Sequence, residues 1–365
     1  MRVLATIGFS FSAGVFLAAL LPWNGWQLYA AGGVLLLALA WLFAARKQKY
    51  FRRGLLILLP LAVSLAYFAG YDHLVRQPIE DRCGAASDFT ATVCDWPQAT
   101  ERGAKITVEL EGYHRARAVL YGEAELLAAR PGDTVTGTAQ WQSAAHFDSD
   151  DVTHFNARGV YALLYGREDV RLSAGDGDAL RWLPQRAGKA FREKVAAIWD
   201  DPRVSGFLTA ELTGDKSAMD DGDYLAMQET GLAHLFAVSG LHCAFLVTLL
   251  ALLISRRQRL LCAVTIPLLL FYMVMVGMSP SVVRACIMQI FLLIAPLFRR
   301  GSDPLTSLAA ALLVILLCNP FAAASVSLQL SFSATLGMVL LSPRLYKLLT
   351  GWYKGKCRPL RTALC

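Results

Sequence analysis

The stretch Gly231 to Val247, GLAHLFAVSGLHCAFLV, places two histidines, a serine and a glycine inside an apolar run. A helix needs about 20 apolar residues to cross a bilayer. The run from Ala244 to Ile254 reaches that length only if residues 232–240 are included. A helix interrupted at Ser239-Gly240 would free backbone polar groups that lipid cannot satisfy, so the break must face protein or water. The stretch therefore predicts a broken or re-entrant crossing.

Composition predicts a membrane protein around this crossing. Of the 365 residues, 55% are hydrophobic, and the mean hydropathy is +0.43. These values exclude an ordinary soluble domain and favour a polytopic α-helical membrane protein with one polar insert. The formal charge of +7 is compatible with a nucleic-acid partner. It decides little, because membrane proteins collect Lys and Arg in cytoplasmic loops for topological reasons.

Basic loops fix the predicted orientation. The loop Arg46 to Arg53, RKQKYFRR, carries five basic residues and is expected in the cytoplasm. The N-terminus is then cytoplasmic, and the insert that follows Tyr71 lies outside the cytoplasm. The expected crossings are residues 3–21, 26–45, 55–71, 231–254, 260–276, 282–298, 304–319 and 326–341. This order places every basic loop inside and every charge-free turn outside.

The insert predicts a small β-barrel. Residues 88–96, 105–122, 133–142 and 159–166 alternate apolar and polar side chains between Gly, Pro or Asp residues. About five strands with an irregular excursion at residues 143–156 suit an OB-like fold. The predicted parts of the chain are three helices at 1–71, an extracytoplasmic OB-like domain at 72–182, amphipathic membrane-surface helices at 183–230, a helical domain with a broken helix at 231–343, and a basic cytoplasmic tail at 344–365.

Four side chains of the insert are candidates for binding a single nucleic-acid strand. OB-folds combine a basic groove with stacking aromatic rings, and the candidates Tyr113, Arg115, Arg117 and Tyr121 fall within one predicted strand region. The charge of the insert argues against a general platform, since residues 72–181 hold 18 acidic and 11 basic residues, a balance of −7. DNA contact along a local stripe and purely structural strand pairing both remain open.

The cysteines fall into two groups. Cys83 and Cys94 lie in the polar insert, and a disulfide between them is expected if the insert is outside the cytoplasm. Four others, Cys243, Cys262, Cys286 and Cys318, lie in apolar runs and are expected to be small buried hydrophobic residues.

Arg284 is the main candidate for a charged group at membrane depth. It lies in an apolar run directly after Ser279-Pro280-Ser281, where its charge needs a partner, water or an anion. A passing phosphate meets that need, with Ser281 beside the same path. The alternative is that Arg284 reaches back to the outer surface and only anchors the helix end.

The two histidines at the predicted break, His234 and His242, could line a path, bind the freed carbonyls or ligate a metal. Their spacing of eight residues is not a metal-ligand pattern, so no metal is expected. A hydrolase using Ser239 is disfavoured, because a nucleophile needs a base and an orienting group, and no carboxylate accompanies the histidines. Neither a GxSxG nor an HExxH motif occurs.

The sequence resembles the ComEC family, whose members are thought to pass single-stranded DNA across the inner membrane during natural transformation. The resemblance covers roughly residues 200–342 and rests on five segments in the family's order. They are GDKSAMDDGDYLAMQETGLAHL, HLFAVSGLH, SPSVVRACIM (279–288), RRGSDPLTSLAAALLVILLCNP (299–320) and SLQLSFSATLGMVLL (327–341). The resemblance also implies an OB-like domain in the insert and a possible pore role for Gln329 within LQLSF.

The family resemblance implies a channel for incoming single-stranded DNA, without a cofactor. Expected partners are the strand, membrane lipids, a second copy of the chain, a cytoplasmic DNA motor and a separately encoded C-terminal half. Many relatives carry a C-terminal metallo-β-lactamase-like domain, and the sequence given ends after GWYKGKCRPLRTALC without one. Nuclease activity is therefore not expected of this polypeptide. A small-solute or lipid transporter is the alternative function, and an intramembrane hydrolase the more distant one.

Overall fold

The computed structural model describes most of the 365 residues. The described ranges are 3–20, 26–44, 51–101, 103–113, 116–145, 154–167, 169–177, 179–214, 219–231, 240–254, 257–298 and 303–352. Three of the predicted site residues, Arg115, His234 and Ser239, lie outside these ranges.

Eight apolar helices of the described residues overlap the eight predicted crossings, and the predicted helix break at Ser239 lies outside those residues. They are α1 (Val3–Leu20), α2 (Trp26–Ala44), α3 (Phe51–Tyr71), α9 (Gly240–Ile254), α10 (Gln258–Met275), α11 (Pro280–Ile294), α12 (Pro304–Cys318) and α13 (Val326–Trp352). Within the described residues, five helical stretches are long and apolar enough to cross a membrane, whereas the apolar parts of α2, α9 and α12 are shorter. The prediction of a multi-pass helical protein is confirmed at this level.

Two predicted boundaries are wrong. The third helix does not end at Tyr71, because the chain stays helical through the π-helical turn η1 (Asp72–Arg76) and α4 (Gln77–Glu80). The sequence predicts that Asp72 begins the polar insert, but Asp72 forms an i, i+4 ion pair with Arg76 inside this helix. The last helix also continues past residue 341, through Pro343 to Trp352. The expected tail therefore begins as helix.

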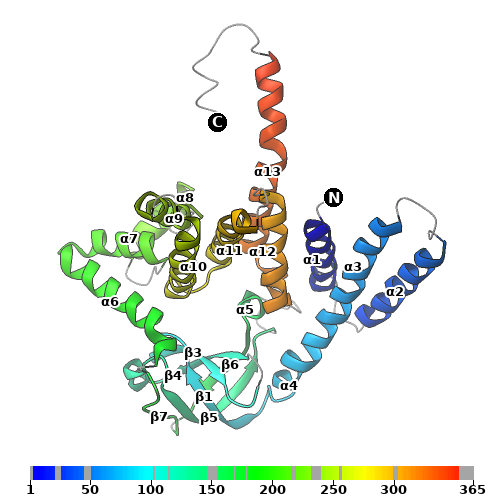
Figure 1. Cartoon of the computed structure of the whole chain (residues 1–365). Helices are drawn as coiled ribbons and strands as arrows, with labels where there is room; N and C mark the ends of the chain where they lie inside the picture. Colours follow the sequence, from blue (N-terminus) through cyan, green and yellow to red (C-terminus); the bar gives the residue numbers. More distant parts are fainter. Residues whose placement is uncertain are drawn as a thin grey trace.

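The insert forms a closed β-barrel, which lies at one end of the molecule, below the helices in Figure 1. Its strands are β1 (Ala86–Val93), β2 (Gln98–Thr100), β3 (Gly103–Leu110), β4 (Arg117–Gly122), β5 (Thr134–Ser143), β6 (Val160–Gly166) and β7 (Arg171–Ser173). The order β1-β3-β4-β6-β5 closes through pairing of β1 with β5, and only β4 and β6 run parallel among the described pairs. This is the five-stranded Greek-key arrangement of an OB-fold.

Alternating side chains fill the barrel. Along β3, residues Ala104, Ile106, Val108 and Leu110 are buried and their neighbours are not. The large rings of Trp141 and Phe89 also point inward and are almost fully buried. The period of two that predicted the strands is thus the period of the core.

Three helices lead from the barrel back to the apolar helices: α6 (Leu183–Ile198), α7 (Pro202–Thr213) and α8 (Asp221–Glu229). The start of α6 is fastened to the barrel, because the Trp96 indole donates a hydrogen bond to the Gln185 carbonyl at 3.1 Å. Lys189 Nζ lies 3.9 Å from the centre of the Trp96 ring. Further along, Gly188 packs against the backbone of Met275 in α10. Helix α6 therefore links the barrel to the helical domain.

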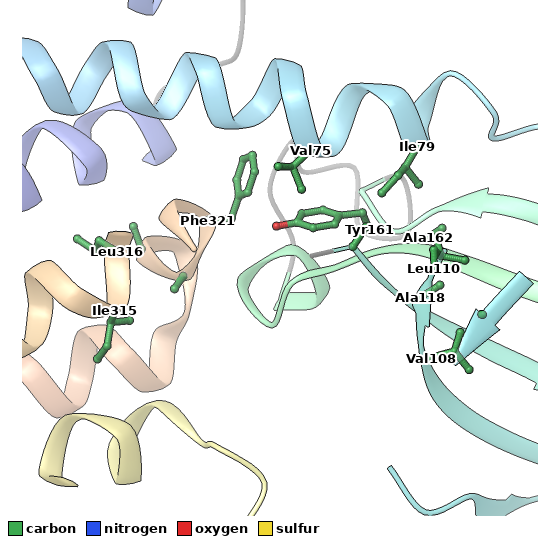
Figure 2. Close-up of a cluster of buried hydrophobic side chains, with 14 of the residues drawn as sticks. Val75, Ile79, Val108, Leu110, Ala118, Tyr161, Ala162, Ile315, Leu316 and Phe321 are labelled. Carbon is green, nitrogen blue, oxygen red and sulfur yellow. The ribbon is translucent and has the colours of Figure 1, made fainter. Parts of the chain in front are cut away.

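The barrel also docks on α3 and on the turn η6 (Pro320–Ala324) after α12. Figure 2 shows Phe321 and Tyr161 pointing toward one another beside Val75 and Ile79, with the Phe321 and Tyr161 ring centres 6.0 Å apart. The Asn319 side-chain amide donates to the carbonyls of Asn156 and Ala157 at 2.9 and 3.1 Å. We call Asp72, Arg76, Tyr161, Asn319 and Phe321 the barrel joint.

Candidate functional site

Arg284 lies one turn into α11 and reaches across to α13. Its Nε donates a hydrogen bond to Ser331 Oγ at 2.7 Å, and its Nη1 donates to Thr335 Oγ1 at 2.6 Å. Ser331 and Thr335 are four residues apart and so lie on one face of α13. The guanidinium carbon is also 5.9 Å from the centre of the Phe332 ring. Two hydroxyl groups and one ring thus fix the direction of this side chain.

These contacts do not neutralise the charge of Arg284. Of the carboxylates in the described ranges, none lies within the 4.0 Å ion-pair distance of its guanidinium. Hydroxyl groups orient a cation but leave its charge in place, and an uncompensated charge at membrane depth favours an anion or water nearby. The arrangement is therefore suited to meeting an anionic solute.

The first residue of α9 lies beside this charge. A Cβ atom added to Gly240 would come within 3.5 Å of the Ala285 side chain and 4.0 Å of Arg284 Nη2. A residue without a side chain lets α9 approach α11 closely here. Gly240 of α9 and Arg284 of α11 therefore lie side by side at this helix contact.

His242 interacts with a residue that the sequence did not single out. Its Nε2 lies 3.8 Å from Oε1 of Glu211 in α7, and both side chains are partly exposed. The two groups attract as a charge pair only when the histidine is protonated. Glu211 is 31 positions earlier in a surface helix, so no local spacing indicated this contact. Among the residues described, no group of three or more potential metal ligands occurs.

The remaining helical candidates take different positions. Ser281 lies in the first turn of α11, three residues before Arg284 and on the same side of the helix. The Gln329 amide donates to the Ala323 carbonyl at 2.8 Å, so its polar group is used to close the η6 turn. His234 and Ser239 cannot be placed, because they lie outside the described residues.

One barrel candidate was misplaced. Tyr113 does not lie on a strand, because Gly112 adopts a left-handed conformation (φ +82°) and turns the chain between β3 and β4. The Tyr113 ring instead packs 6.5 Å from Trp141, and the Arg82 guanidinium lies over it at 5.4 Å. Tyr113 therefore lies in a turn rather than on a strand face, and its contact with DNA stays a prediction.

Tyr121 forms an aromatic pair that the sequence did not predict. It lies on β4 and stacks on Tyr165 of the parallel strand β6, with ring centres 5.3 Å apart and planes 12° apart. Burial, and then the neighbouring phenol, raise the pKa of Tyr121, so its hydroxyl stays protonated at physiological pH. Arg117 is exposed at the start of the same strand. Tyr121, Tyr165 and Arg117 are the barrel face that we call the tyrosine face.

The expected disulfide between Cys83 and Cys94 is wrong, since both residues are free thiols. The eight-residue strand β1 separates them and spans roughly 25 Å, whereas a bridge requires Cα atoms about 4.4–6.8 Å apart. Their Sγ atoms donate instead to the carbonyls of Ile79 and Thr92. Burial raises the pKa of each thiol to about 11.

Comparison with known proteins places the helical site in a defined domain. Residues 212–362 match the family described as "Competence protein". The chain is also 32% identical over 144 residues to ComE operon protein 3 of Bacillus subtilis (strain 168), a match that covers 39% of this chain and 19% of that protein. The matched part is thus about a fifth of the relative's length. No solved structure matches the chain.

Gly240, Arg284, Ser331 and Thr335 all lie within the matched residues. The motifs quoted from the sequence lie in the region that the family model matches. Residues 212–362 of the chain are therefore similar to the competence protein family.

Proposed function

We propose that the chain forms part of an inner-membrane channel that passes single-stranded DNA into the cytoplasm during natural transformation. The observation that carries the proposal is Arg284, a cation held by two hydroxyl groups beside Gly240 of α9, with no described carboxylate within ion-pair distance. A strand presents one phosphate per nucleotide. A fixed charge without a counterion attracts each phosphate in turn.

The barrel favours single-stranded DNA, rather than a small anion, as the transported solute. Single strands bind OB-folds by stacking bases on aromatic rings along a basic groove. The tyrosine face offers a stacked ring pair with Arg117 on the same strand. Because the insert as a whole is acidic, we propose that the strand contacts this face and not the whole barrel.

The proposed role is transport rather than catalysis. Membrane lipids surround the exposed apolar side chains of α9 and α13, such as Leu241 and Leu330. We propose that a cytoplasmic DNA motor supplies the pull, and that a second copy or a separately encoded C-terminal half completes the channel. The competing proposal is a transporter of small phosphate-like anions, because the charge of Arg284 would suit those anions as well.

The proposed orientation is testable first. Alkaline phosphatase fused after Asp200 is expected to be active, since the barrel and α6 then lie outside the cytoplasm, and a fusion after Arg53 is expected to be inactive. Activities are normalised to the amount of fusion protein in the membrane. The opposite pattern would reverse the crossing order and place the barrel in the cytoplasm.

The proposed solute is tested genetically. Deleting the gene in a competent host is expected to lower transformation to the background without added DNA, while labelled DNA still binds the cell surface. The full chain supplied from a plasmid should restore uptake. Unchanged transformation in the deletion strain would contradict the DNA channel and favour the small-anion transporter, which radiolabelled phosphate ester uptake would then reveal.

A further inference from the structure

Two buried cysteines meet between α9 and α11. The Sγ atoms of Cys243 and Cys286 are 3.5 Å apart, and both residues are fully buried and unbridged. A disulfide bond is about 2 Å long, so the two sulfur atoms are about 1.5 Å from bonding distance. The 43 positions between them make this a contact of the fold rather than of the local chain.

The thiol pair lies at the same contact between α9 and α11 as Gly240 and Arg284. Gly240 and Cys243 lie one turn apart on α9, and their neighbours across the contact are Ala285 and Cys286 on α11. These small side chains let the two helices approach closely. Arg284 immediately precedes this pair of α11 residues and reaches back toward Gly240. A covalent bond between the cysteines would therefore fix the helices at the point where Arg284 is presented.

We infer that Cys243 and Cys286 are a redox pair whose oxidation locks α9 to α11. The oxidant is a disulfide. In the first step one cysteine thiolate attacks this disulfide, forms a mixed disulfide and releases one donor thiolate. In the second step the other cysteine sulfur attacks the mixed disulfide, closes the Cys243–Cys286 bond and releases the second donor thiolate. The two protons of the cysteines go to the two released thiolates. The protein dithiol is oxidised and the donor disulfide is reduced to two thiols.

Cys286 lies near one end of α11, six residues from Pro280. At about 1.5 Å per residue this is roughly 9 Å from the start of that helix. In the proposed orientation this end is extracytoplasmic, the side on which disulfides persist.

The chemical test uses the full chain in detergent with the other six cysteines replaced by serine. It is treated with 4,4′-dithiodipyridine, a small disulfide, and analysed by intact mass and non-reduced peptide mapping. The expected product has lost two hydrogen atoms, carries no pyridyl adduct and yields a linked 243–286 peptide. In the matched control, only Cys262 and Cys286 are kept. Cys262 lies in the same buried cluster, but its Sγ bonds to the Leu293 carbonyl, so pyridyl adducts or unreacted thiols are expected.

Pyridyl adducts at both Cys243 and Cys286 would contradict the proposal that these residues form a redox pair. A disulfide that forms equally well in the control would contradict it too. A chain that stays unreacted in the native state but bridges after partial unfolding would also overturn it, because the lock requires folded helices. These readouts do not depend on DNA transport.

The consequence for uptake rests on the proposed function and has its own control. Oxidation of cells with the same disulfide is expected to lower DNA uptake in the unaltered strain, with recovery after reduction, and to spare a Cys243→Ser strain. Equal inhibition of both strains would contradict the lock. If neither strain takes up DNA before treatment, the proposed function fails while the mass readout still decides the cysteine pair.

Discussion

Replacing Arg284 with glutamine is expected to lower DNA uptake by at least about tenfold, because it removes a fixed positive charge that the phosphates of the strand would meet. Arg284→Lys should retain an intermediate uptake, since it keeps the charge but loses the paired donation from Nε and Nη1 to Ser331 and Thr335. The measurement is internalised labelled DNA per molecule of membrane protein.

The fold should survive these replacements. Without Arg284, Thr335 can still donate to the Ser331 carbonyl within α13, a bond that is already present at 2.9 Å. Arg259→Gln, at the start of α10, is the matched control and should leave uptake unchanged. Full uptake by Arg284→Gln at normal abundance would remove Arg284 from the path and support the alternative that it anchors a helix end.

Replacing Asp72 with alanine is expected to destabilise the protein by about 3–5 kcal/mol, the range for breaking a buried ion pair on one side. Arg76 Nε lies 2.5 Å from the Asp72 carboxylate, and the two side chains are 7% and 0% exposed. The variant would leave Arg76 with Glu80 at 3.7 Å and the Phe321 ring as its neighbours. Thermal unfolding of the full chain in detergent measures the loss.

Two further variants distinguish the effect of breaking the Asp72–Arg76 ion pair on stability from the effect of removing any one carboxylate. Asp81→Ala removes an exposed carboxylate a few residues away, and it should change stability by no more than about 0.5 kcal/mol. The double variant Asp72→Leu with Arg76→Met should recover most of the loss, because no buried charge is left unpaired. A loss below about 1 kcal/mol for Asp72→Ala would show that the barrel joint does not depend on this pair.

The barrel illustrates what local pattern can and cannot predict. Alternation identified the strands, since the side chains that alternate in the sequence are the ones that fill the core. Pairing was not predictable in this way, because the neighbours of β4 and β6 depend on how the whole barrel closes. Tyr165 was therefore missed, although it faces Tyr121. Tyr113 was placed on a strand because the sequence pattern does not show that Gly112 turns the chain.

The helical site shows the same division. Arg284 stood out because a lone charge in an apolar run is costly wherever it points. Its partners Ser331 and Thr335 follow 47 and 51 positions later, and nothing in their own helix distinguishes them from other small polar residues. The predicted end of the third helix before Asp72 is wrong for a related reason. A charged residue after an apolar run suggests a helix end, but here the charge is paired with Arg76 inside the helix.

The most direct test of the proposed DNA path is photocrosslinking during uptake. A benzophenone side chain placed at position 281, one turn before Arg284 on the same side of α11, is irradiated while labelled DNA enters the cell. The control position is 252, where Leu252 is 76% exposed on α9 and would face lipid. We predict a covalent complex of this chain with single-stranded DNA at position 281 and none at position 252. Crosslinking at 252 alone, or equally at both positions, in cells that still take up DNA would contradict a path beside Arg284.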